Sequence, residues 1–125
     1  MNSLRITLGI ALGLVALICT RVVTAGGADV IDAIVKCENN FCIFNVTVAH
    51  EDEGWQHFAN AIEVLNAEQD EILGFRVLRH PHVGQKSFTR PVTVLFEILP
   101  EKVYLRAHDS IHGYDGKVYE LTMPN

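Results

Sequence analysis

The chain has 125 residues, with 10 Lys or Arg against 15 Asp or Glu, so its formal net charge is −5 when histidine is neutral. This length suits one domain. The acidic balance, with no basic stripe along the sequence, argues against nucleic-acid binding, which depends on Lys and Arg neutralising phosphates.

The first 25 residues have the pattern of a secretory signal peptide. One Arg precedes an almost wholly apolar run over residues 6–19, and Val23-Thr24-Ala25 resembles a small-residue cleavage site. We therefore expect residues 1–25 to be removed and residues 26–125 to form a domain that is periplasmic or secreted. Cys19 could instead mark a lipid-anchored start, but the two residues before it are bulkier than the usual recognition site.

Cleavage there would also make the remaining domain more acidic. Without Arg5 and Arg21, 8 basic residues stand against 15 acidic ones, which gives a net charge of −7. No long apolar run follows residue 25, so we expect a soluble mature domain without a membrane span.

Cys37 and Cys42, in the stretch CENNFC, are the cysteines that follow the predicted signal peptide. Export to an oxidising compartment favours a disulfide between them. The spacing allows this bond if residues 38–41 form a hairpin turn, and so short a loop means that the bond would mainly fix the turn. The alternative, a pair of thiolate metal ligands, is disfavoured by the same compartment.

Seven short apolar or alternating runs follow, separated by turn residues. In residues 41–49 the apolar side chains alternate with polar ones, which is the two-residue period of a half-buried strand. The runs are Val30–Lys36, Phe41–Ala49, Ala59–Asn66, Ile72–Leu78, Pro91–Leu99, Lys102–Ala107 and Val118–Met123. Seven strands in about 100 residues predict an all-β domain, an antiparallel immunoglobulin- or fibronectin-like β-sandwich.

This topology makes a prediction about the histidines. Consecutive antiparallel strands run in opposite directions, so the loops alternate between the two ends of the domain. If the Cys37–Cys42 turn lies at one end, three loops at the other end contain all the histidines: His50, His57, His80, His82, His108 and His112. The alternative is that surface loops simply collect polar residues.

A shared histidine site would point to a transition metal, because neutral imidazole binds iron, copper, zinc and nickel. We expect iron or copper, with His50, His57, His108 and His112 as the main ligands and His80 and His82 next. Asp109 could orient the rings from behind. The acids at positions 51–53 could do the same, although solvated loop charges are the better interpretation for them.

The segments AHEDEGWQHFANAIEVL and LRAHDSIHGYDGK resemble the iron-site segments of the superoxide reductase family, which includes desulfoferrodoxin and neelaredoxin. The resemblance covers roughly residues 50–117. It implies an immunoglobulin-like sandwich that binds one iron through four histidines and an axial cysteine thiolate. His50 and His57 match the family's first histidine pair, and His112-Gly113 matches its last histidine and glycine.

The chain departs from the family pattern in three ways. Asp109 stands at the cysteine position, the gap between His50 and His57 is one residue longer than usual, and no histidine precedes His50. The axial thiolate tunes the iron's potential, so its absence would change the chemistry. The resemblance therefore implies the fold and a metal site more than it implies superoxide reduction. The segments HPHVGQKSFTR and AHDSIHGYDGK are also similar to small exported bacterial proteins without an assigned role.

Trp55 lies between His50 and His57, and Arg79 and Arg90 flank the loop that carries His80 and His82. Trp55 could shield a site from water, although packing beneath its loop is the better interpretation because aromatic residues dominate small cores. Arg79 and Arg90 could attract an anion towards this end. The His80-Pro81-His82 segment should be extended, so its two rings could chelate or could simply be exposed.

No nucleophile elbow or phosphate-binding loop occurs, so the sequence identifies no catalytic residue. Two functions are consistent with it. The chain is either an exported metal-binding protein with possible redox activity, or a metal-free periplasmic module whose loops bind a protein partner. Convergence of three or more imidazoles on one point would favour the metal-binding protein.

Overall fold

The structure of the protein is a computed structural model that describes residues 26–125, and in this part of the chain it contains seven strands and no helix. The predicted signal peptide, residues 1–25, lies outside the described residues. The strands are β1 Asp29–Glu38, β2 Phe41–Ala49, β3 Ala59–Leu65, β4 Ile72–Val77, β5 Ser87–Leu95, β6 Lys102–Asp109 and β7 Tyr119–Thr122.

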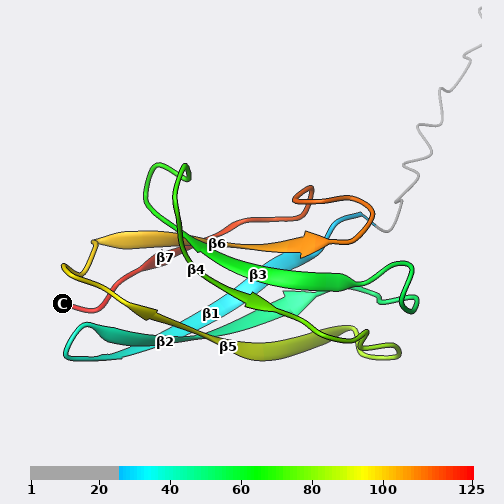
Figure 1. Ribbon diagram of the computed structural model, residues 1–125, viewed down its shortest axis with the longest axis horizontal. Helices are drawn as coiled ribbons and strands as arrows, with labels where there is room; N and C mark the ends of the chain where they lie inside the picture. The colour runs from blue at the N-terminus through cyan, green and yellow to red at the C-terminus, as the bar shows by residue number, and fades with distance from the viewer. Residues whose placement is uncertain (1–25) are drawn as a thin grey trace, which may run out of the picture.

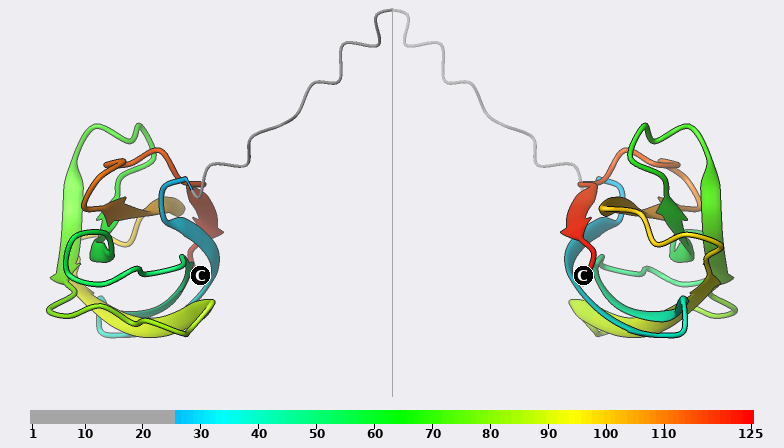
Figure 2. Two further views of the ribbon diagram at one scale, coloured as in Figure 1. Left: turned by 90° about the vertical axis from the view of Figure 1, so that its right-hand side faces the viewer. Right: turned by 90° about the vertical axis from the view of Figure 1, so that its left-hand side faces the viewer.

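The strands form two antiparallel sheets, with the orders β1-β2-β5 and β4-β3-β6-β7. The sheets lie face to face (Figure 1), and the view along the strands shows them enclosing a common interior (Figure 2). Phe44 and Val46 from one sheet and Ile62 and Leu105 from the other are fully buried in one hydrophobic cluster. The prediction of an all-β domain with two antiparallel layers is therefore confirmed.

Alternation along the central strands explains which side chains face this interior. In β2 the residues Cys42, Phe44, Val46 and Val48 are buried, while the residues between them are partly or fully exposed. In β6 every second residue from Val103 is buried, and Asp109 occupies the last inward position. The pleat of β6 therefore carries a carboxylate into the end of the hydrophobic core.

The bounds of strand β5 differ from the predicted ones. The expected run was Pro91–Leu99, whereas the strand begins at Ser87 and ends at Leu95. Phe88 is buried in step with Val92, so the alternation starts before the proline. Pro91 is tolerated because β5 is an edge strand, where a missing N–H can face solvent. The other predicted strands agree with the observed bounds to within two residues.

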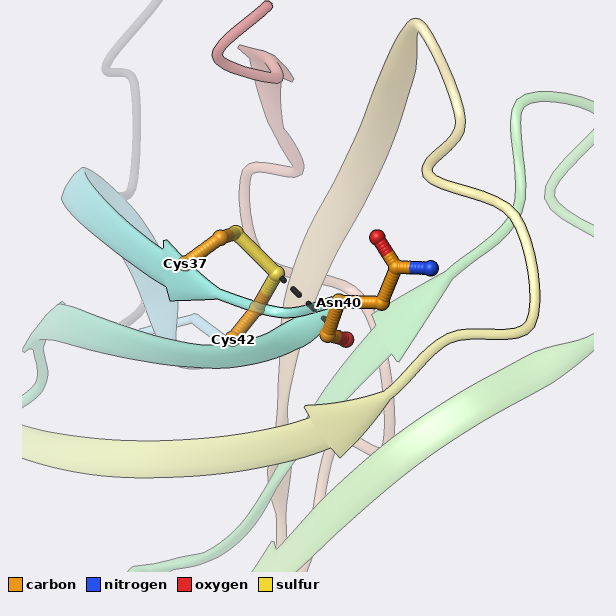
Figure 3. Close-up of a disulfide and its surroundings, with 3 residues drawn as sticks. All are labelled: Cys37, Asn40 and Cys42. Atoms are coloured by element: carbon orange, nitrogen blue, oxygen red, sulfur yellow. Dashed lines mark hydrogen bonds between the residues drawn. A yellow bond between two sulfur atoms is a disulfide. The ribbon is translucent and has the colours of Figure 1, made fainter.

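The β1–β2 hairpin closes with a two-residue turn and a disulfide. Asn39 and Asn40 both have positive φ, 50° and 65°, as the turn type that matches the twist of paired strands requires. Cys37 and Cys42 are paired across the strands with Cα atoms 4.0 Å apart and form the predicted bond (Figure 3). Bonded to each other, they offer no thiolate to a metal.

Residues 26–125 contain no helix that is long and apolar enough to cross a membrane.

Candidate metal centre

The six histidines lie at the end of the domain opposite the disulfide turn. His50 follows β2, His57 precedes β3, His80 and His82 follow β4, His108 is in β6, and His112 is in the loop after β6. In Figure 1 the arrowheads of β2, β4 and β6 all point to the right, whereas the β1–β2 turn lies at the left. The alternation of strand direction places the histidines as the sequence predicts, but their side chains separate into three groups.

The first group can hold a metal ion. His50, His57 and Asp109 each offer one ligand atom, and these three atoms lie within 4.8 Å of one another. His57 Nε2 is 2.8 Å from Asp109 Oδ2, and His50 Nε2 forms a hydrogen bond with the same oxygen. All three residues are buried, and Asp109 is completely inaccessible. They come from three separate positions in the chain, so the tertiary fold assembles the group.

Asp109, which the sequence predicts as a residue that could orient the rings, is itself a candidate ligand in the structure. Its other oxygen, Oδ1, accepts hydrogen bonds from the backbone N–H groups of Ile111 and His112, at 2.8 and 2.7 Å. Burial raises the pKa of Asp109, but the hydrogen bonds from these two amides and from the His50 and His57 rings outweigh it and hold the pKa below its usual value. The group is therefore a carboxylate.

The loop between β2 and β3 fixes both histidines of the group. The N–H of His50 donates to the Lys86 carbonyl at 3.2 Å, which ties the end of β2 to the loop before β5. Further on, the N–H of Glu53 donates to the His57 carbonyl and the N–H of His57 donates to the Gly54 carbonyl, at 2.8 and 3.1 Å. Gly54 has φ +123°, a conformation that favours glycine. This tight turn directs His57 inwards.

Asp52 supports His50 from behind, and the interpretation of this acid as a solvated loop charge is wrong. Its side chain is fully buried, and Oδ1 lies 2.5 Å from His50 Nδ1. The same oxygen accepts the Ala59 N–H at 3.0 Å, and Oδ2 accepts the His82 N–H at 2.6 Å. A carboxylate behind an imidazole fixes its orientation and raises its basicity, as at many metal sites. Glu51 and Glu53 are exposed, as expected.

Both ring nitrogens of His50 thus face carboxylates. Without a metal, the two hydrogen bonds require a proton on each nitrogen or on a carboxyl group. A cation in the place of the proton between His50 Nε2 and Asp109 would satisfy the same partners. Exchange of protons for a metal ion is the usual linkage at sites built from histidine and carboxylate groups.

The second group is formed by His80 and His82. Their ring centres are 5.1 Å apart, but His80 is exposed while His82 is buried and stacks on Phe88 at 4.2 Å. An Arg90 guanidinium nitrogen lies 2.8 Å from His82 Nε2, so this nitrogen is the acceptor. Burial, and next the charge of Arg90, lower the pKa of His82. His82 is therefore a neutral ring that supports Asp52 through its backbone, not a member of the buried group.

The third group surrounds His108. Its Nδ1 lies 2.5 Å from Asn60 Oδ1, and its ring packs edge-on to Tyr114 with the centres 4.8 Å apart. Its hydrogen-bond partner is therefore an amide on the neighbouring strand. His112 is closer to the buried group, since its ring centre is 5.2 Å from that of His57. The geometry thus separates His108 from the predicted ligands and leaves His112 beside them.

A third buried carboxylate, Glu63, which the sequence interpretation missed, holds the loop after β6. Glu63 in β3 accepts a hydrogen bond from the Tyr114 hydroxyl and lies 3.1 Å from an Arg106 guanidinium nitrogen. The hydrogen bond to Glu63 and then burial raise the pKa of Tyr114. The Arg106 guanidinium also stacks over the Tyr114 ring at 3.7 Å. These contacts fix the loop that supplies the amides of Ile111 and His112.

Trp55 does not pack beneath its loop, so the predicted packing role is wrong. The residue is 69% exposed, and its ring contacts Phe58 edge-on with centres 5.8 Å apart. The tight turn at Gly54 directs His57 inwards and leaves Trp55 on the surface. Trp55 therefore does not fill the core.

No protein-family model matches the chain, and no solved structure gives a significant match. A curated protein from Halomicrobium mukohataei, named "Putative lipoprotein", is 33% identical over 91 residues, which cover 72% of this chain and 44% of that protein. The chain therefore spans less than half the length of the curated relative that it matches.

Proposed function

We propose that this protein is an exported transition-metal-binding protein whose ligands are His50 Nε2, His57 Nε2 and Asp109 Oδ2. The observation that carries the proposal is the convergence of two imidazoles and one carboxylate, rather than the three imidazoles that the sequence criterion named, within 4.8 Å in a buried position. Asp52 would orient the His50 ring from behind, and the amides of Ile111 and His112 would hold the Asp109 carboxylate. His112, next to His57, is the nearest further imidazole.

The donor set favours iron over copper. Non-haem Fe(II) sites commonly bind the metal through two imidazoles and one carboxylate on one face and leave the other coordination positions open. His50 also lines a surface cavity of about 430 Å³, which Gly26, Glu51 and Lys86 border. A small molecule could approach the His50 side of the site from this cavity.

The finer proposal is an immunoglobulin-like sandwich with a redox-active iron, similar to superoxide reductase. Its support is the match of His50, His57 and His112-Gly113 to the family's segments, together with the antiparallel two-sheet fold. Asp109 would supply oxygen where that family has a thiolate. Because a thiolate donates more electron density, we expect the reactivity of this iron to differ.

Export is supported by two findings. The Cys37–Cys42 disulfide is typical of oxidising compartments. The second is the printed name of the curated relative, "Putative lipoprotein". For this chain we propose a periplasmic or secreted location, with residues 1–25 as the export signal.

The test is metal analysis of the protein purified from its native compartment, followed by titration of the EDTA-treated protein with Fe(II), Cu(II) and Zn(II). We expect one ion per chain, and loss of tight binding in His57→Ala. His80→Ala is the matched control, since His80 is an exposed histidine at the same end. Circular dichroism confirms that each variant is folded. Metal-free wild-type protein that binds no ion, or equal affinity in His57→Ala, would contradict the proposal.

Redox activity needs a separate measurement. If the bound metal is iron, the reduced form should be oxidised rapidly by superoxide, and the spectrum should show the ferric product. Slow oxidation would leave metal binding intact but remove the redox role.

One observation favours the second candidate, an interaction module. Three apolar side chains on the loops that carry the histidines are strongly exposed: Trp55 at 69%, Val83 at 64% and Ile111 at 59%. Exposed apolar residues on loops can form part of a protein interface. Failure of wild-type protein to bind any metal, with its fold intact, would favour this function.

A further inference from the structure

A second pocket lies close to the buried group and has a different chemistry. It has a volume of about 150 Å³ and lies where the end of β4 and the following loop approach β5. Its polar lining consists of three arginines and two histidines: Arg76, Arg79, Arg90, His80 and His82. No acidic residue lines it.

The three arginines carry charge that the protein does not neutralise. In the part of the chain that the structure describes, none of them lies within 4.0 Å of a carboxylate oxygen, whereas Arg106 and Lys102 each do. Residues 26–125 contain 8 basic and 15 acidic side chains, so three of the eight cations face one small pocket in an acidic domain. Like charges brought together in this way repel one another unless an anion lies between them.

Arg76 and Arg90 make contacts that hold their positions without removing their charge. Arg76 donates to the Pro91 carbonyl at 3.2 Å. Arg90 donates to the Thr89 carbonyl at 2.7 Å and to His82 Nε2 at 2.8 Å. All three acceptors are neutral, so each guanidinium keeps its full charge and further N–H groups.

The two histidines of the pocket do not neutralise the positive charge of the arginines. His82 is buried, and its Nε2 is used by Arg90, so the ring acts as a support for the guanidinium. Its Nδ1 has no hydrogen-bond partner and lies 3.7 Å from Asp52 Oδ2. Asp52 is the acid beside the His82 ring, and it is already hydrogen-bonded to His50 and to the amides of Ala59 and His82.

We propose that this pocket is a binding site for a small oxyanion, with the guanidinium groups of Arg76, Arg79 and Arg90 as its donors. A planar guanidinium fork matches the oxygen pairs of carboxylate and phosphate groups. The volume admits a group of a few heavy atoms, such as inorganic phosphate or the carboxylate end of a larger molecule. The site uses none of the proposed metal ligands, so it does not depend on the metal.

The test is a calorimetric titration of the EDTA-treated full chain with inorganic phosphate at constant ionic strength, with acetate and chloride as parallel arms. We expect saturable binding of phosphate, acetate or both, and no saturable binding of chloride. Binding of phosphate alone identifies a phosphate-type ligand, and binding of acetate identifies a carboxylate ligand. Either result supports an oxyanion site.

Arg79→Gln should weaken binding at least about tenfold, since it removes a charged donor of hydrogen bonds. Arg79 is exposed and has no packing role that would unfold the domain. Lys36→Gln is the matched control, because it removes one positive charge from an exposed position in β1 near the disulfide end. No saturable oxyanion binding, equal affinity in Arg79→Gln, or equal losses in both variants would overturn the proposal.

Discussion

Asp109 is the residue on which the candidate metal centre depends. A fully buried carboxylate is costly unless hydrogen bonds or a cation compensate for the lost water. Here two backbone amides and two imidazoles surround it, and the pKa remains below its ordinary value despite burial. Such a group offers a fixed carboxylate oxygen beside two imidazole nitrogens, which is a donor set that suits a divalent cation.

Asp52 should also influence the affinity for the metal, although it is not one of the proposed ligands. Asp52→Asn keeps the shape of the side chain but removes the charge behind His50. We expect metal affinity to fall by about 10- to 100-fold, as is typical for such supporting groups. Competition with a chelator of known affinity measures it.

Glu51→Gln is the control for this prediction, because it removes an exposed charge from the adjacent position. Equal affinity of Asp52→Asn and wild-type protein would show that the hydrogen bond to His50 has no influence on the site.

At the scale of elements, the loop after β6 depends on the conformation of Gly113. This residue has φ +62°, and its N–H and carbonyl both pair with the backbone of Asp109, at 2.9 and 2.8 Å. An added Cβ would meet nothing within 4 Å. Any cost of a substitution therefore comes from the left-handed backbone itself.

We expect Gly113→Ala to lower the free energy of unfolding by about 1–2 kcal/mol, because alanine disfavours this conformation. Asparagine tolerates it better, so Gly113→Asn should lose less. Urea unfolding of the three proteins measures the difference. Identical stability of the alanine variant and wild type would mean that the loop adopts another conformation.

The β1–β2 hairpin should contribute stability without affecting the metal centre. In the chain-entropy account, a disulfide that closes a loop of about six residues stabilises a protein by about 2 kcal/mol. Replacing Cys37 and Cys42 together by serine should lower the free energy of unfolding by about this amount.

Metal affinity should stay within about twofold in the same double variant, since distant sites behave independently. The disulfide and the buried histidines lie at opposite ends of the strands (Figure 1). A large loss of metal affinity would show that the hairpin and the site are coupled through the sheets.

At the scale of the whole molecule, the proposed metal would join the two sheets. His50 follows β2 in the three-stranded sheet, whereas Asp109 ends β6 in the four-stranded sheet. A ligand that binds only the folded state stabilises it, by about 2.7 kcal/mol when its free concentration is 100 times Kd. We therefore expect the thermal midpoint to rise with added metal.

This rise should disappear in His57→Ala and persist in His80→Ala, as differential scanning fluorimetry with and without EDTA would show. An unchanged midpoint in wild-type protein at saturating metal would contradict a site that bridges the sheets.

Much of the fold follows from local patterns in the sequence. The two-residue alternation of Phe41–Ala49 and Lys102–Asp109 sets which side chains face the core, and turn residues set where strands end. Because antiparallel strands reverse direction, these patterns also place the histidines at one end. The start of β5 was less predictable, since Pro91 interrupts a strand that only its edge position permits.

Local sequence patterns therefore predict the strands apart from the bounds of β5, together with the cysteine pairing and the end of the domain at which the histidines lie. Which of these histidines lie close together depends on the tertiary fold. Contacts between residues far apart in the chain bury Asp52 and place Asp109 beside His50 and His57. Tertiary contacts also give His82 and His108 their separate partners. Loop residues lack a periodic pattern, so their environment is set by the packing of the two sheets.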